Sequence, residues 1–194
     1  TIDGTSYNVS SAGLGSGGDI GADGKGNFRI KNSYADFNIG PMFNAKVGIQ
    51  GVTVARGFIF DDDVASVLLT GKFGTVTGVL AWANVNNDEV QGFDIATTSS
   101  YNQNIWAALG VVKISDAMSV TPYFVYHSIT DHVLLEDSDN FYLGADLDMK
   151  FGSVAAWATG IYNGGDINGL DNQAFLGAVG VDAGIVHGQF FYAS

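Results

Sequence analysis

Apolar residues alternate with polar or small ones through residues 141–151, FYLGADLDMKF. The odd positions from Phe141 to Phe151 are all apolar, whereas the even positions include Asp146, Asp148 and Lys150. Successive side chains of a β-strand point to opposite faces, so the pattern predicts a strand with one apolar and one polar face. Its length suits a tilted strand that crosses an outer membrane, which needs roughly 9 to 11 residues, whereas soluble strands average about 5 to 6.

The same alternation recurs along the chain and predicts ten strands. Weaker alternation at 2–9 indicates an eleventh strand, and the glycine-rich remainder of 1–26 is predicted to be loop. A single β-barrel domain over 1–194 is expected. The ten predicted strands are 27–40, 42–51, 64–73, 75–84, 101–114, 119–128, 141–151, 154–163, 174–185 and 186–193.

The predicted connections alternate between short and long. Tight turns are expected near residues 40, 73, 116, 152 and 185, and long acidic loops at 51–63, 85–101, 129–139 and 163–172. Outer-membrane barrels meander in this way, with short turns at one end and long loops at the other, whereas Greek-key sandwiches do not. The fold class predicted is therefore an all-β, transmembrane, antiparallel up-and-down barrel, with a soluble β-domain as the alternative.

Composition narrows the function classes. The net charge of −12 makes nucleic-acid binding unlikely, because few cations are present to replace phosphate counterions. Only 14% of residues are charged, below the roughly 25% of typical soluble domains. Cysteine is absent, and no run of 18 apolar residues could form a spanning helix. We expect a surface that partly faces membrane lipid and lipopolysaccharide.

The direction of the strands bears on closure. If the tight turns are periplasmic, the last predicted strand ends on the opposite side of the membrane, and a further downward strand is required. The sequence also ends in FFYAS, without the terminal aromatic residue typical of outer-membrane barrels. We therefore expect the ten to twelve strands of this chain to belong to a larger barrel.

Three pieces of sequence carry a family resemblance: FRIKNSYADF, KVGIQ and ARGFIFDDDVASV, which lie within residues 27–74. There the chain resembles porin-like outer-membrane proteins of deltaproteobacteria, similar in pattern to alginate-export barrels. The resemblance covers residues 26–86 and continues beyond them only as a strand pattern. It implies a monomeric or homo-oligomeric diffusion channel for small hydrophilic solutes in the outer membrane of a Gram-negative bacterium. Such barrels have about 16 to 18 strands, more than this chain supplies.

Charged and polar residues on the polar strand faces are the candidate lumen residues. Opposed charges across a pore select solutes, whereas in a narrow barrel the same groups neutralise one another inside a plugged wall. The strand number decides between these readings. The candidate lumen residues are Arg29, Lys31, Lys46, Gln50, Lys72, Asp146, Asp148 and Lys150.

Acidic residues gather in the predicted long loops, which predicts an anionic rim that mildly favours cations. A Ca²⁺ site is one interpretation of the run Asp61, Asp62 and Asp63 together with Asp166 and Asp171. A solvated acidic loop is favoured, since consecutive carboxylates rarely all reach one ion, and 166–172 lacks the final glutamate of a calcium loop. No cofactor is expected.

Catalysis is not expected. The three histidines, His127, His132 and His187, show no metal-ligand spacing, and no nucleophile stands in a recognisable frame. Aromatic residues near the predicted loop-side strand ends suit an interfacial girdle at lipid-headgroup depth. These residues are Trp82, Tyr101, Trp106, Phe124, Tyr126, Phe141, Trp157, Tyr162 and Phe175.

Two functional hypotheses follow. The first is a porin-like channel for passive diffusion. The second is a structural or adhesive outer-membrane barrel whose acidic loops bind cations, lipopolysaccharide or a protein partner. A soluble secreted β-protein is a third alternative.

Overall fold

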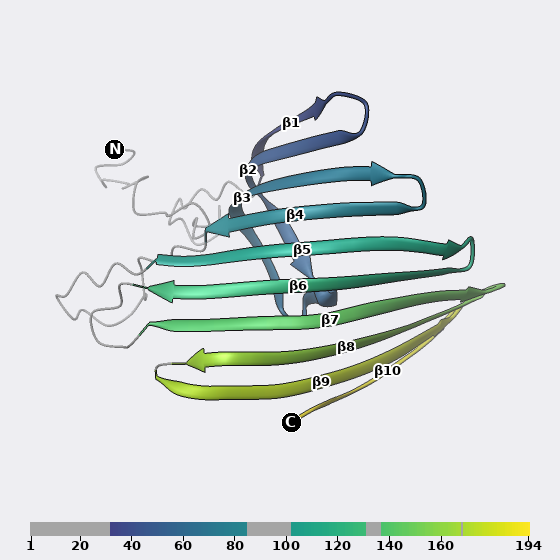
Figure 1. Ribbon diagram of the computed structural model, residues 1–194. Coiled ribbons are helices and arrows are strands. Elements are labelled where there is room, and N and C mark those ends of the chain that lie inside the picture. The colour runs from purple at the N-terminus through teal and green to yellow at the C-terminus, as the bar shows by residue number, and fades with distance from the viewer. Residues whose placement is uncertain (1–31, 85–101, 131–136, 168) are drawn as a thin grey trace, which may run out of the picture.

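The computed structural model describes residues 32–84, 102–130, 137–167 and 169–194. They form one ten-stranded antiparallel sheet in which every strand lies beside its neighbours in sequence (Figure 1). The strands are β1 (Ser33–Ile39), β2 (Phe43–Val54), β3 (Phe60–Phe73), β4 (Val76–Asn84), β5 (Asn102–Ser115), β6 (Met118–Thr130), β7 (Ser138–Phe151), β8 (Val154–Ile167), β9 (Leu170–Ala183) and β10 (Val186–Ala193), and a short 3₁₀ turn, η1 (Ala55–Gly57), lies between β2 and β3. The predicted all-β, up-and-down arrangement is confirmed.

All five predicted tight turns are present at one end of the sheet. Two predicted long loops are wrong, however. In the first, 51–63, β2 continues to Val54 and β3 begins at Phe60. In the second, 163–172, β8 and β9 extend until only residues 168 and 169 separate them. The predictions ended these strands at polar and glycine residues, but hydrogen bonding to the adjacent strand continues through them.

Each face of the sheet carries the side chains that the alternation predicts. On β7 the odd residues from Phe141 to Phe151 point outward, to the convex face, and the even residues point inward. Residues that lie opposite each other on paired strands point to the same face, so the other strands have the same two faces. For example, Asp146 lies opposite Thr159 of β8, and Thr159 lies opposite Ala178 of β9. The sheet therefore has an apolar outer face and a mixed inner face.

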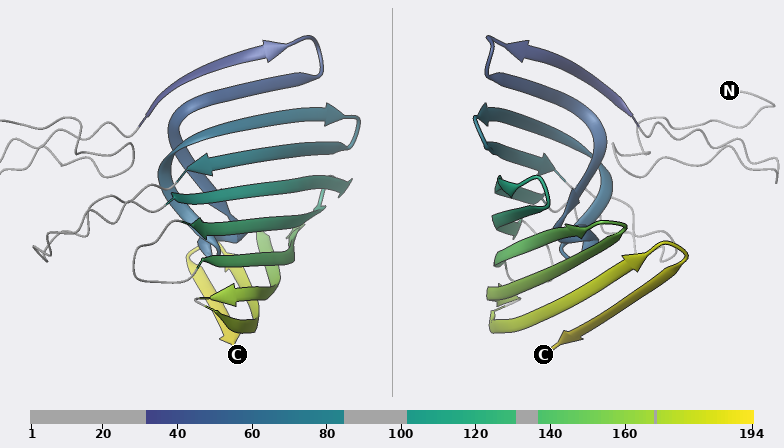
Figure 2. Two further views of the ribbon diagram at one scale, coloured as in Figure 1. Left: turned by 60° about the vertical axis from the view of Figure 1, so that its left-hand side comes forward. Right: turned by 90° about the vertical axis from the view of Figure 1, so that its right-hand side faces the viewer.

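The far half of the β2–β3 hairpin bends over the inner face. Its residues 50–54 and 60–64 pair with each other but have no partner in β4, whose described part ends at Asn84. Figure 2 shows the two strands curling away from the sheet and crossing behind it. Val64 of the hairpin, 2% exposed, packs in one cluster with Val125 of β6, which is fully buried. The apolar core thus lies between the bent hairpin and the sheet.

The sheet is curled but not closed. Within the described residues, β1 pairs only with β2 and β10 only with β9. Figure 2 shows these two strands at opposite ends of the arc. The predicted strand at 2–9 lies outside the described residues, and the larger barrel stays a prediction. No helix in the described part of the chain is long and apolar enough to span a membrane.

Candidate functional site

The tip of the bent hairpin is a tight turn centred on Arg56. The Phe58 amide donates to the Ala55 carbonyl at 2.9 Å, and Arg56 (φ 57°, ψ 25°) and Gly57 (φ 87°) have the left-handed torsions of a type I′ turn. Ala55 is also left-handed, with φ 54°. Left-handed backbone costs a non-glycine residue about 1–2 kcal/mol, so contacts around the tip must hold it.

Arg56 supplies those contacts, on β7 and β8. Its Nη2 donates to Asp148 Oδ1 at 2.7 Å, and its Nε donates to Thr159 Oγ1 at 3.2 Å. The guanidinium also lies over the Trp157 ring, 4.9 Å from its centroid. Thr159 in turn donates to Asp146 Oδ1 at 2.7 Å. One cation on the hairpin is thereby tied to two carboxylates on the wall.

Two glycines make room for the aromatic rings of this site. A Cβ at Gly180 would lie 2.3 Å from the Trp157 ring, so no larger residue fits there while Trp157 faces inward. A Cβ at Gly144 would likewise meet the Tyr123 ring and hydroxyl at 2.5–2.6 Å. The Tyr123 hydroxyl is buried close enough to Asp146 to interact with its carboxylate, but within the described residues it makes no hydrogen bond of good geometry.

A cavity of about 750 Å³ opens from Arg56 toward the tight turns. Three basic and three acidic residues line it: Arg56, Lys113, Lys150, Asp116, Asp148 and Asp182. Most are paired, since Lys113 lies 2.9 Å from Asp116 and His187 contacts Asp182. The Lys113 ammonium, which donates a hydrogen bond to Asp116, lowers the pKa of that exposed carboxyl below its ordinary value. The lining of the cavity is thus part polar and part apolar, with equal numbers of basic and acidic residues.

The structure places six of the eight candidate lumen residues on the inner face. Asp146 and Asp148 lie at the Arg56 site, and Lys150 lines the cavity. Lys46 lies apart from them, 3.6 Å from Asp36, and Gln50 is buried and donates to Ser66. Lys72 lies opposite Thr77 near the turns. Arg29 and Lys31 lie outside the described residues.

Sequence reasoning missed Arg56, Trp157, Thr159 and Tyr123 as members of this site. Trp157 was expected in the outer girdle, which is wrong because its ring faces inward beneath Arg56. One signal for the bent hairpin was available: apolar residues on both sides of ARG, in VTV and FIF, are unusual for a solvated loop.

The acidic residues are distributed differently from the prediction. Asp61, Asp62 and Asp63 lie within strand β3 rather than in a loop, so their side chains alternate between faces. Asp166 and Asp171 face each other across β8 and β9. No group of three candidate ligands among the described residues could hold a metal ion. His127 contacts Gln103, whereas His132 lies outside the described residues.

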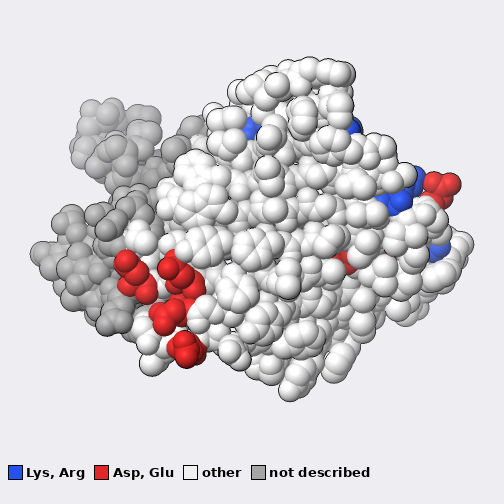
Figure 3. Space-filling model, viewed as in Figure 1, with Lys and Arg blue, Asp and Glu red and all other residues white. Residues whose placement is uncertain are grey.

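The outer face carries rows of side chains that run across the strands. One row is polar: Asn84, Asn104, Ser128, Asp139, Asp166 and Asp171. The next row toward the turns contains Trp82, Trp106, Tyr126 and Phe141, and the one after it Leu80, Phe124, Leu143, Tyr162 and Phe175. Figure 3 shows acidic groups gathered at one end of β7–β9, beside a broad uncharged surface.

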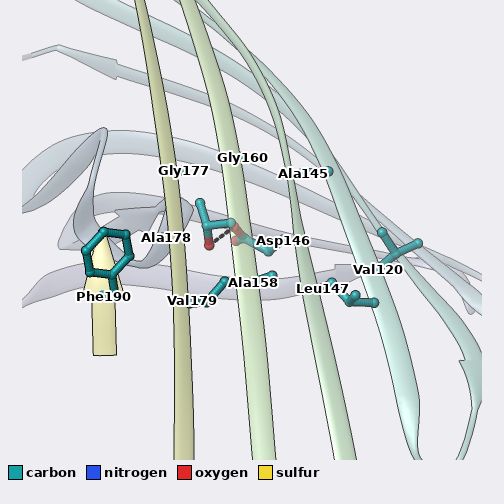
Figure 4. Close-up of a pocket in the computed structure, with 11 residues that line it drawn as sticks. Val120, Ala145, Asp146, Leu147, Ala158, Gly160, Gly177, Ala178, Val179 and Phe190 are labelled. Atoms are coloured by element: carbon teal, nitrogen blue, oxygen red, sulfur yellow. Dashed lines mark hydrogen bonds between the residues drawn. The ribbon is translucent and has the colours of Figure 1, made fainter. Parts of the chain in front are cut away.

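A shallow apolar groove of about 380 Å³ crosses the same outer face (Figure 4). Small residues, including Ala145, Gly160 and Gly177, form its floor. Its sides are formed by the larger residues Leu147, Val179 and Phe190. The hydrogen bond between Thr159 and Asp146 lies at the same level of the sheet.

No family model, curated protein or solved structure matches the chain. The resemblance to porin-like proteins therefore stays a prediction.

Proposed function

We propose that the chain forms the wall of an outer-membrane channel through which small hydrophilic solutes diffuse, with a mild preference for cations. The observation that carries the proposal is the outer face. Large apolar side chains are exposed on this face. Leu80, for example, is 59% exposed and Leu143 is 58% exposed. A soluble monomer rarely exposes a contiguous apolar surface of this kind.

The dimensions of this surface support the assignment. From Phe141 to Phe151 the outward residues of β7 span ten residue steps, about 33 Å along the strand. A strand tilt of about 40° reduces that to about 25 Å, the height of the apolar band of outer-membrane barrels. The aromatic row and the adjacent polar row lie at one border of the band, where rings and charges meet lipid headgroups.

The inner face supports the channel part of the proposal. It presents a cavity lined by charged as well as apolar residues, and the bent hairpin places Arg56 beside Asp148. Opposed charges that line a passage discriminate among solutes by charge. The preference for cations follows from the excess of carboxylates in the chain as a whole, 20 acidic against 8 basic residues.

Conductance in planar bilayers tests this function. We expect stepwise, ohmic openings and a reversal potential that favours cations. Arg56→Asn retains a residue that tolerates the left-handed turn but removes the charge, so cation preference should rise. Arg56→Lys keeps the charge and is the matched control, with selectivity close to that of the unmodified protein.

A structural or adhesive barrel is the second candidate, favoured by one observation: the bent hairpin fills part of the inner face with apolar side chains. A protein that inserts stably into detergent micelles or bilayers but never conducts would support this candidate against the channel. A protein that stays monodisperse at high concentration without detergent would exclude both.

A further inference from the structure

Ion pairs occupy five of the six charged side chains that line the cavity of about 750 Å³ at the turn end of the inner face. Lys150 is the one left over, because within the described residues no carboxylate lies within ion-pair distance of its ammonium group. Figure 3 shows basic groups at this end of the sheet. The pairs are Arg56 with Asp148, Lys113 with Asp116, and Asp182 with His187 of β10.

Strand register places the Lys150 side chain in this cavity. Lys150 is an even residue of β7 and points to the inner face, as Asp148 does. It lies opposite Ala155 of β8, whose small side chain leaves room for the ammonium group. The main-chain N–H of Lys150 donates to the Ala117 carbonyl at 2.8 Å and holds the backbone beside the next turn. The exposed side chain therefore stands on a hydrogen-bonded strand and can meet a solute.

Further hydrogen-bond donors face the same cavity. Arg56 uses its Nε for Thr159 and its Nη2 for Asp148, so its Nη1 donates to none of the described residues. The hydroxyls of Thr77 and Ser119 also line the cavity and have no side-chain partner in the described part of the chain. Ammonium and guanidinium groups form their strongest hydrogen bonds with anionic acceptors, of which the carboxylate is one. The unused groups of the cavity thus suit a small anion.

We propose that this cavity attracts small carboxylate anions and that Lys150 determines the attraction. A volume of about 750 Å³ is typical of sites for small molecules. Because Lys150 is exposed, the attraction is weak enough for a solute to leave again, as conduction requires. Passage of the anions rests on the proposed channel function, whereas their attraction to the cavity does not. Lys150 thereby moderates, at the turn end, the cation preference of the channel as a whole.

A single thiol beside Lys150 tests the attraction without a measurement of conductance. The chain has no cysteine, so Ala155→Cys introduces one reporter, directly opposite Lys150 in the cavity. Its reaction rates are measured in non-ionic detergent micelles with two methanethiosulfonate reagents, the anionic sulfonatoethyl and the cationic trimethylammonioethyl compound. At about 0.1 M salt, one charge about 6–8 Å away changes each local reagent concentration about twofold. Lys150→Gln should therefore lower the ratio of the anionic to the cationic rate about fourfold.

Matched variants in the same Ala155→Cys background separate charge from structure. Lys150→Arg keeps the charge and should keep the ratio. Lys46→Gln removes a lysine that pairs with Asp36 and does not line the cavity, so the ratio should not change. Asp182, on the other side of Ala155, is the same in every variant, and its effect cancels. At about 1 M salt the Debye length falls to about 3 Å, and the difference between Lys150→Gln and the unmodified residue should disappear.

Reversal potentials in a gradient of potassium acetate test passage through the channel. Lys150→Gln should raise the permeability of potassium relative to acetate about twofold, and Lys150→Arg should leave it unchanged.

The two measurements can fail separately. A rate ratio that is the same with Gln and Lys at position 150 would overturn the proposal, and a protein that still conducts would leave the channel function standing. A ratio that falls as expected in a protein that never conducts would support the anion-attracting cavity and refute the channel.

Discussion

The hairpins β2–β3 and β8–β9 are built alike but end differently. Both have long strands, and both were expected to finish in long acidic loops. β2–β3 bends into the inner face, whereas β8–β9 stays within the sheet, paired with β7 up to Asp139 and Asp166. Their far ends differ in chemistry: Val52, Val54 and Val64 in the first are buried, whereas the second carries asparagines and aspartates.

This comparison shows that alternation determines which face a side chain occupies, but not where the strand goes. β2 and β3 extend beyond the described parts of their neighbours β1 and β4. β1 begins at Ser33, opposite Ile49, and the described part of β4 ends at Asn84. A hairpin end that has no described strand on either side can bend, and burial of its valines favours the bend. The far end of β8–β9 instead satisfies its polar groups locally, for example through Asn163 and the Phe141 carbonyl.

A charge in the bent hairpin should have the largest effect. Val64→Asp places a carboxylate in a site that is 2% exposed, and we expect a loss of about 3 kcal/mol or more in the free energy of unfolding. Leu170→Asp places the same charge at the far end of β8–β9, where the side chain is 71% exposed, and should cost less than about 1 kcal/mol. Urea titration in detergent micelles measures both. Equal losses would mean that burial does not distinguish the two hairpins.

The sequence predicted the sheet well because period-two alternation is a local property. All ten strands, five tight turns and the two faces of β7 follow from it. The site was predicted only in part: Asp146 and Asp148 stood out as charges on a strand face, but their partner Arg56 is 92 residues from Asp148 in the chain. Its position depends on the bend of a hairpin, which tertiary packing decides.

A substitution that takes the space of the Trp157 ring should have the next largest effect on stability, because this ring packs against the tip of the bent hairpin. Gly180→Ala would force the Trp157 ring away from a Cβ only 2.3 Å from it and disturb the stack on Arg56, at a cost of about 1–3 kcal/mol. Gly177→Ala, three residues earlier on β9, meets nothing closer than 3.6 Å and should change stability by about 0.5 kcal/mol or less. Urea midpoints at unchanged m-value compare the two. Similar losses would show that strand glycine itself, rather than the ring, sets the cost.

The ion pair at the hairpin tip should contribute less, because both partners are partly exposed. Asp148→Asn removes the carboxylate that Arg56 contacts at 2.7 Å, and we expect a loss of about 1 kcal/mol that diminishes with added salt. Asp36→Asn, which removes the partner of Lys46 at 3.6 Å away from the tip, should cost less than about 0.5 kcal/mol. A double-mutant cycle with Arg56→Asn isolates the coupling. Coupling near zero would leave apolar packing alone to hold the tip.

The smallest effect that we expect is an increase in stability, from a substitution at Tyr123. Packing beneath the bent hairpin leaves the buried Tyr123 hydroxyl without a hydrogen bond of good geometry in the described residues, whereas the polar side chains of β8–β9 bond to one another. An unsatisfied buried hydroxyl is destabilising, so Tyr123→Phe should raise the free energy of unfolding by up to about 1 kcal/mol. Tyr142→Phe, on the same face of the neighbouring strand β7, is the control and should be nearly neutral. A loss of about 1 kcal/mol at Tyr123 would instead show that the hydroxyl bonds in solution, and that the inner face beneath the hairpin satisfies its polar groups as fully as β8–β9 does.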